Sequence, residues 1–395
     1  MINSAGPLPV PLVLHTPARY RLAYRTEHFL VAVTYTPRAA ILDVLNAVPA
    51  LGVRNSSAVK TLVLHTLPPI ACGPGRDPGE FDLGAGARGI ADVLPGALVA
   101  GVRGEVTEIL HLIAANRPDV VFNACEAPLG RPGLEPHAAA LLEWLGVRFT
   151  GSGSATLALC RRKDRTNAVL AAMGVPVPRR DVFPCIVKPA DEDGSAGIHA
   201  GSVCEDAAAL ALARTRLPGR VVVEEFLPGR EFVVAMWGRD APDHVSVGET
   251  RFLAGLRVLT YSSKWDTESD DFAKSPIFYD CELEPRLRQA IVAAAQGAWI
   301  AVEARGYMRV DIRLNSAGSP FVLDVNPNPE MGPGLAYAGP CRKRAGPGSA
   351  SCDSRSNGRR DQTALSAGPR VRAGHARRLR NVHRCGSVCG LADGR

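Results

Sequence analysis

Two acidic residues on a predicted β-hairpin late in the sequence could bind a metal ion. Two runs of alternating apolar and polar residues flank a short turn that contains Gly318, which is the pattern of a hairpin. If the turn is centred on Gly318 and the residue before it, Asp311 pairs with Asp324 and Arg309 pairs with Asn326. Side chains alternate between the two faces of a strand, so all four should project from one face.

The residue types on this face favour a hard cation. Asp311 and Asp324 would repel each other, and a cation between them would remove that repulsion. With the amide oxygen of Asn326 they suit Mg²⁺ or Mn²⁺, whose remaining ligands are water and phosphate oxygens. Without metal, one carboxyl group should resist ionisation. The alternative is a polar hairpin face that only contacts solvent.

Three lysines could bind phosphate groups. Lys188 ends an apolar run and is followed by a loop that contains Gly194 and Ser195. Small residues let backbone N–H groups approach phosphate oxygens, and a lysine adds positive charge. Lys163, near the start of a predicted helix, and Lys264 are further candidates. A strand lysine can also simply extend to the surface, so each one alone is weak evidence.

An acidic strand end could bind a nucleoside. Glu224 and Glu225 end a predicted strand, and Phe226 and Leu227 follow them. Free backbone groups at a strand end, an aromatic face and an acid could hold an adenine base, and Glu231 could bind ribose hydroxyls. The alternative is an ordinary solvated strand end.

The composition limits the class of protein. The 395 residues are enough for two or three domains, and we find no apolar run long enough for a transmembrane helix. The cysteines are scattered without a C-x-x-C pair, which indicates a cytoplasmic protein with reduced thiols. From residue 341 onwards there are thirteen Lys/Arg and three Asp, so this segment accounts for the whole net charge of +7. The rest is slightly acidic, which argues against nucleic-acid binding.

The order of predicted elements indicates an α/β domain followed by an α+β region. The first strand of a parallel sheet is expected at 62–66, which repeats five residues seen at 12–16. Alternating β and α segments then predict a parallel sheet covered on both faces. The expected strands are 29–35, 119–123, 147–150, 185–189, 221–226 and 231–236, and the expected helices are 39–48, 105–115, 135–145, 162–173, 207–215 and one within 285–306, with a short helix from about 155.

A glycine pattern at 84–89 matches G-x-G-x-x-G but is a weak candidate for a dinucleotide site. That fingerprint must follow a strand directly, whereas residues 77–83 contain Pro, Gly and acids. The sequence has no P-loop pattern, so an ATP site would have to be built in another way.

Taken in order, these features resemble the ATP-grasp superfamily, and within it the D-alanine–D-alanine ligase-like branch. The resemblance covers about residues 58–339. It is carried by the segments 119–123, 149–152, 174–178, 186–189, 224–226, 229–231, 261–264, 309–311 and 324–326, together with Lys163, Gly194 and Ser195.

The resemblance implies a pre-ATP-grasp α/β domain at 58–154, a small lobe or lid at 155–222 and a large lobe at 223–339. It implies that ATP binds between the lobes and that Lys163, Lys188 and Lys264 hold its phosphates. Adenine would lie near Glu224, Phe226 and Leu227, ribose near Glu231, and two Mg²⁺ ions near Asp311, Asp324 and Asn326, while Arg309 would stabilise a charged tetrahedral intermediate. The implied reaction is carboxylate attack on the γ-phosphate to give an acyl phosphate, which an amine then attacks.

Some features depart from the family pattern. The Gly-rich loop that grips the first amino acid in the ligases is not evident after residue 62, and Glu126, Glu135 or His137 could instead bind an amine or a metal. The substrate is therefore left as an amino acid or a peptide-like molecule, and a homodimer is one expectation for the assembly.

The two ends of the chain also differ from the family pattern. Residues 1–57 form an uncertain extension, and residues 340–395 are predicted to be a disordered basic tail because they have no hydrophobic period. The alternative function is therefore an inactive ATP-binding relic or interaction protein with an aberrant C-terminus.

Overall fold

The computed structural model describes residues 20–26, 29–35, 59–67, 83–94, 96–239, 241–265, 269–279 and 282–331. The predicted helix at 39–48, the repeat at 12–16 and the predicted tail at 340–395 lie outside these residues. The predicted strand at 29–35 is β2 (Phe29–Tyr35), which pairs antiparallel with β1 (Tyr20–Thr26).

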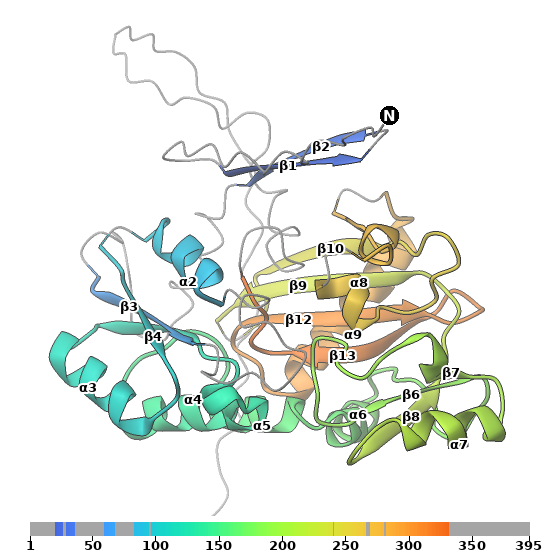
Figure 1. The fold of residues 1–395 in the computed structure, drawn as a ribbon, viewed down its shortest axis with the longest axis horizontal. Helices are drawn as coiled ribbons and strands as arrows, with labels where there is room; N and C mark the ends of the chain where they lie inside the picture. The colour runs from blue at the N-terminus through green and yellow to red at the C-terminus, as the bar shows by residue number, and fades with distance from the viewer. Residues whose placement is uncertain are drawn as a thin grey trace, which may run out of the picture. The chain divides into compact units, whose positions relative to one another are not determined.

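The first domain is built on a parallel sheet in the order β4-β3-β5, shown in blue and cyan in Figure 1. Its strands are β3 (Thr61–Thr66), β4 (Leu98–Val102) and β5 (Val120–Ala124). The predicted first strand is thus the centre of the sheet. All six residues of β3 are buried, as expected for a strand with neighbours on both edges and both faces.

Helices cover both faces of this sheet, as the sequence predicts. Val63 packs with α2 (Leu83–Ala91), whereas Leu62 and Leu64 pack with α3 (Val106–Asn116) and α4 (Glu135–Trp144). The G-x-G-x-x-G pattern lies inside α2 and not in a loop after a strand, so it does not form a dinucleotide fingerprint.

The predicted strand at 147–150 is wrong. Only Phe149 forms an isolated bridge, parallel to Val121. Gly151, two residues after Phe149, has a φ of +84°. The chain therefore turns away from β5 at Gly151, and the pairing with β5 does not continue.

The second unit of the fold is a small three-stranded sheet with helices. Its strands are β6 (Cys185–Pro189), β7 (Val203–Cys204) and β8 (Val221–Glu225), in the antiparallel order β7-β6-β8, and α7 (Ala207–Thr215) packs on them. Before them in the chain come α5 (Ser154–Cys160), which packs with the first domain, and α6 (Lys163–Ala172), which packs with the core that contains Trp299. Asp206 caps α7 by accepting a hydrogen bond from the backbone N–H of Ala209. Because β8 pairs with β6, the small lobe continues past the boundary predicted after residue 222.

The third unit is a five-stranded antiparallel sheet in the order β11-β10-β9-β12-β13 (Figure 1). Its elements are β9 (Glu231–Gly238), β10 (His244–Thr250), α8 (Tyr261–Trp265), β11 (Ile277–Phe278), α9 (Pro285–Ala301), β12 (Gly306–Leu314) and β13 (Pro320–Asn326). Short 3₁₀ turns lie at Pro128–Gly130, Pro132–Leu134, Ala200–Ser202 and Phe272–Lys274. Trp299 of α9 packs with Met308, Val310 and Ile312 of β12, so the opposite face of β12 is left for other contacts.

A close backbone contact fixes where β12 begins. Gly306 has a φ of +74°, and a Cβ atom at this position would lie 2.8 Å from the backbone nitrogen of Gly151. Any larger residue would push the first domain away from the strand. The next residue, Tyr307, places its hydroxyl 3.2 Å from the backbone oxygen of Asn123. The start of the predicted metal-binding hairpin is therefore held against the first domain.

Candidate active site

The hairpin has the register that the sequence predicts. Arg309 pairs with Asn326 and Asp311 pairs with Asp324. Beyond this point the register shifts by one residue, because a bulge at Leu323 sets Ile312 opposite Val322. Residues 309, 311, 324 and 326 are each half-buried on the face opposite the α9 core, where their side chains can meet a ligand.

Lys163 is the centre of an ion-pair network. It is the first residue of α6, and its Nζ atom lies 2.9 Å from Asp193 Oδ1 and 3.4 Å from Asp324 Oδ1. It also donates to the backbone oxygen of Glu192 at 2.8 Å. Burial alone would lower the pKa of Lys163, but Asp324 and Asp193 together raise it, so this side chain is held as a cation.

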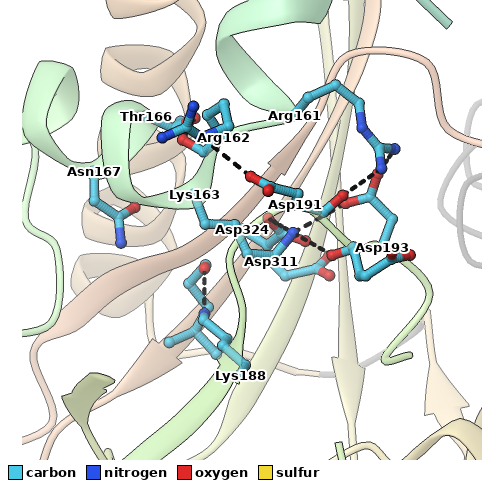
Figure 2. Close-up of polar contacts among 12 residues, drawn as sticks. Arg161, Arg162, Lys163, Thr166, Asn167, Lys188, Asp191, Asp193, Asp311 and Asp324 are labelled. Carbon is cyan, nitrogen blue, oxygen red and sulfur yellow. Dashed lines mark hydrogen bonds and ion pairs between the residues drawn. The ribbon is translucent and has the colours of Figure 1, made fainter. Parts of the chain in front are cut away.

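The loop that carries Asp193 is fastened by the cations at the α5–α6 junction (Figure 2). Arg161 forms a short ion pair with Asp193 and donates to the backbone oxygen of Asp191 at 2.6 Å. Arg162 lies 3.1 Å from Asp191 Oδ1. The predicted loop residues Gly194 and Ser195 follow, both with a φ of +63°. The chain therefore turns sharply at the loop that the sequence predicts to bind phosphate.

Lys188 joins the small lobe to the hairpin. Its Nζ atom lies 2.8 Å from Glu224 Oε2 and donates to the backbone oxygen of the bulge residue Leu323 at 3.1 Å. Glu224 is only 1% exposed and also accepts a hydrogen bond from Asn167. In this structure Glu224 therefore orients Lys188 and does not face open space.

The prediction that one of the opposed acids resists ionisation is wrong for Asp324. Burial would raise the pKa of Asp324, but Lys163, Lys188, Arg309 and Lys264 lower it. The repulsion expected between the two acids is outweighed because four cations surround the site.

Lys264 contributes a further cation to this site. It lies on α8, and within the part of the chain that the structure describes it has no hydrogen bond or ion pair. Burial and Arg309 lower its pKa, while Asp311 and Glu231 oppose this effect.

The oxygen atoms of the hairpin fit a magnesium ion. Among the described residues no three His, Cys, Asp or Glu side chains gather into a metal-binding group. Two carboxylates and one amide remain, which suits an ion that completes its shell with water and phosphate. Arg309 donates to Asp311 at 2.9 and 3.1 Å, and Asn326 Oδ1 accepts one hydrogen bond from the backbone of Asn328. Each oxygen group is thus neutralised or oriented, and a lone pair is left on the Asn326 amide oxygen.

The predicted nucleoside end is only partly assembled. Two of the backbone groups at this strand end are already bonded, because the N–H groups of Glu225 and Phe226 donate to the backbone oxygens of Arg179 and Pro184. Glu225 points to the surface and pairs with Arg179 at 2.8 Å, since successive strand residues face opposite ways. Leu227 is buried beside this end of the strand.

Arginines cover the aromatic and acidic groups at this end. The guanidinium of Arg257 lies 4.5 Å from the centre of the Phe226 ring and that of Arg313 lies 5.0 Å from it. Arg313 also pairs with Glu231 at 3.3 Å. Burial raises the pKa of Glu231 although Arg313 opposes this.

Of the three further candidates, Glu126 and Glu135 approach the site and His137 does not. His137 is exposed on α4. Glu126 lines a small cavity, of about 20 Å³, with Asn328 and Glu330. Burial, and then Glu330 and Glu135, raise the pKa of Glu126. Burial also raises the pKa of Glu135, to about 8.

Sequence reasoning missed several residues of this site. Asp193 pairs with Lys163, Asn167 donates to Glu224, and Arg161 holds Asp193. The run Arg161-Arg162-Lys163 at a helix start was a usable signal, because three adjacent cations need nearby acids. Asn328, in Asn326-Pro-Asn328, was a second one.

The fold and the site together define the class. A two-lobed region whose lysines and acids converge on one hairpin face is the arrangement of an ATP-grasp protein. A family model described as the D-ala D-ala ligase C-terminus matches residues 158–344. A D-alanine–D-alanine ligase of Dinoroseobacter shibae is 30% identical over 284 residues, which are 62% of this chain and 85% of that protein. One from Stutzerimonas stutzeri is 30% identical over 240 residues, 57% of this chain and 72% of that protein.

A solved structure agrees with this fold. The D-alanine–D-alanine ligase from Bacillus anthracis complexed with ATP superposes with a TM-score of 0.54 at 18% identity, over 72% of this chain and 91% of that one. The chain belongs to the D-alanine–D-alanine ligase family, whose members are ATP-dependent, ADP-forming ligases that make C–N bonds. None of the helices in the described ranges is long and apolar enough to span a bilayer.

Proposed function

We propose that the protein is a Mg²⁺- and ATP-dependent ligase that joins the carboxylate of one amino acid or peptide-like substrate to the amine of another. The observation that carries this proposal is the convergence of Lys163, Lys188 and Lys264 on the hairpin face of Asp311 and Asp324. Cations beside paired oxygen ligands match a metal–triphosphate complex in charge and in ligand type. A cytoplasmic location and a homodimer remain part of this proposal.

The three lysines and the acids would divide the work of holding ATP. Lys163, Lys188 and Lys264 would contact phosphate oxygens, and Asp311, Asp324 and Asn326 would hold the metal. When bound, Mg²⁺ would neutralise charge on the transferring phosphate. Gly194 and Ser195 would contribute backbone N–H groups from the loop above the phosphates.

The nucleoside would occupy the strand end. Phe226 and Leu227 would pack against adenine, and Glu231 would accept hydrogen bonds from ribose hydroxyls. Glu224 would act by fixing Lys188, because both of its oxygens are engaged. Glu225 would not contact the nucleoside itself; it would hold Arg179 against the strand end.

The reaction would proceed in two displacements. A carboxylate oxygen of the first substrate attacks the γ-phosphorus, the bond to ADP breaks, and an acyl phosphate forms. The amine nitrogen of the second substrate then attacks the carbonyl carbon, loses a proton, and phosphate leaves with the electrons of the C–O bond. Arg309 would stabilise the negative charge on the tetrahedral oxygen. Positioning and charge neutralisation would supply most of the rate enhancement.

The proposal is tested by measuring phosphate release from ATP with pairs of D- and L-amino acids, with and without Mg²⁺. A productive pair should give a product that has lost one water relative to its parts. If the first substrate carries ¹⁸O in its carboxylate, one ¹⁸O should appear in the released phosphate, as an acyl phosphate requires. Release that is independent of any amino acid, or phosphate without the label, would contradict the proposed chemistry.

A further inference from the structure

Asn328 is buried at the junction between the first domain and the hairpin, with a 7% exposed surface. Its Nδ2 atom donates to Glu135 Oε1 at 2.9 Å and to the backbone oxygen of Cys125 at 3.4 Å. Its Oδ1 atom lies 3.1 Å from the hydroxyl of Tyr307. An amide nitrogen has two hydrogens, and both have acceptors here, so the orientation of this side chain is fixed.

The same residue also orients the predicted metal ligand two positions earlier. The backbone N–H of Asn328 donates to Asn326 Oδ1 at 2.9 Å. This bond closes a local turn after β13 and fixes the direction of the Asn326 amide. Because the amide oxygen has two lone pairs, one is still able to bind a cation.

The partners of Asn328 come from two parts of the fold. Glu135 begins α4 and Cys125 follows β5, both in the first domain, whereas Tyr307 belongs to β12. The other oxygen of Glu135 lies 3.8 Å from Arg161, which also pairs with Asp193, the acid that contacts Lys163. One buried amide therefore connects the first domain to the hairpin that carries the predicted metal site.

We infer that Asn328 is a positioning residue for the proposed metal site: it ties Asn326 to Glu135 and so sets the geometry in which the Asn326 amide binds the cation. The inference rests on the proposed function. An asparagine suits this position, since an aspartate would have no amide N–H to donate to Glu135 and would set a second acidic group against it. Residues that orient a metal ligand typically change metal affinity by about 10–100-fold when they are lost.

The test is Mn²⁺ binding to the full chain with a non-hydrolysable ATP analogue, read from the free Mn²⁺ signal in electron paramagnetic resonance. Asn328→Ala should weaken Mn²⁺ binding at least about tenfold. Binding of the nucleotide without metal should stay within twofold of wild type. Asn116→Ala, which removes one local hydrogen bond to Leu112 in α3, is the matched control and should leave both unchanged.

A pair of variants separates positioning from general stability. Glu135→Gln keeps an acceptor oxygen for Asn328 and should bind Mn²⁺ like wild type, whereas Glu135→Ala should lose affinity as Asn328→Ala does. The double variant should be no weaker than either single one, because both remove the same hydrogen bond. If Asn328→Ala does not fold, the comparison of Glu135→Gln with Glu135→Ala tests the inference. If Asn328 only stabilises the fold, the two Glu135 variants should bind Mn²⁺ with equal affinity.

The outcomes also separate this inference from the proposed function. If wild type shows no nucleotide-dependent Mn²⁺ binding, the proposed function fails. If wild type binds Mn²⁺ and the Ala variants bind it within twofold, only the positioning role of Asn328 is overturned.

Discussion

Replacing Asp324 with asparagine removes a charge from the centre of the site with almost no change in shape. Its Oδ1 atom is 3.4 Å from Lys163 Nζ, and its side chain is 25% exposed. Lys188, Arg309 and Lys264 also lower its pKa against the effect of burial. Asp324→Asn therefore leaves several cations with fewer opposing charges, and we expect it to destabilise the metal-free protein.

The size of the effect follows from the geometry. Two unit charges 3.4 Å apart attract by about 5 kcal/mol at an effective dielectric of about 20. The cost of removing the carboxylate from water offsets much of this. We expect a net loss of about 1–3 kcal/mol in the free energy of unfolding at pH 7. The sign is the opposite of what repulsion between Asp311 and Asp324 alone would give, because without the surrounding cations the loss of one of the two charges would be stabilising.

The effect should depend on pH in one direction. The folded state lowers the pKa of Asp324, so its contribution is present above the unfolded pKa of about 3.9 and is lost as pH falls below it. The difference between wild type and Asp324→Asn should therefore be full at pH 7 and should shrink below about pH 4.

The assay is urea denaturation of the full chain in metal-free buffer, followed by tryptophan fluorescence. Trp237 and Trp299 lie in the packed cores around the five-stranded sheet and so report on its unfolding. Asp270→Asn, at an exposed acid, is the control. If Asp324→Asn is as stable as wild type at pH 7, or more stable, the surrounding cations do not stabilise the Asp324 carboxylate and the reasoning is refuted. Unchanged Mg²⁺-dependent nucleotide binding in that variant would refute the metal site.

Three further changes test other contacts. Lys188→Met should cost about 3–5 kcal/mol of stability because it leaves Glu224 buried without its cation, and adding Glu224→Gln should restore stability to urea without restoring nucleotide affinity measured by calorimetry. Asp193→Asn should leave Lys163 with Asp324 as its one paired acid and strengthen ATP binding by about 3–10-fold by calorimetry, and weaker binding would show that the pair helps to build the site. Burial raises the pKa of Glu135 to about 8, so the folded state holds its proton and wild type should lose on the order of 3 kcal/mol as pH rises from about 5 to about 8. Glu135→Gln should remove this pH dependence of the free energy of unfolding in urea. If the variant shows the same pH dependence as wild type, the raised pKa of Glu135 is not its cause.

Features fixed by local chemistry could be predicted from the sequence. The helix at 207–215 was predicted with its exact ends because an N-cap aspartate precedes it and its apolar residues have a helical spacing. The pairing of Asp311 with Asp324 was predicted from the alternation of the two strands, although the turn is centred on Ala317 and not between Ala317 and Gly318, because the bulge at Leu323 offsets this difference. Both depend on residues that are near each other in the sequence.

Features fixed by distant packing could not be predicted. The strands β4 and β10 have weak patterns of their own and form because neighbouring strands offer unpaired backbone groups. The bulge at Leu323 shifts the register by one residue, and no local signal marks it. The contact between Asn328 and Glu135 joins residues 193 positions apart, and residue type alone does not indicate which acid accepts that amide.

The ion pairs of the site determine what a nucleotide must do to bind. Lys163 is held by Asp193 and Asp324, and Lys188 by Glu224, whereas Lys264 has no direct partner in the described residues. If phosphates bind here, they gain Lys264 at little cost but must compete with Asp193 for Lys163. Affinity then depends on the difference between a phosphate contact and an existing carboxylate contact, not on the strength of either. A magnesium ion would shift that balance, because it neutralises Asp324 and leaves Lys163 with one fewer acid to satisfy. Metal and nucleotide should therefore bind cooperatively, with each weakening the internal pairs that oppose the other.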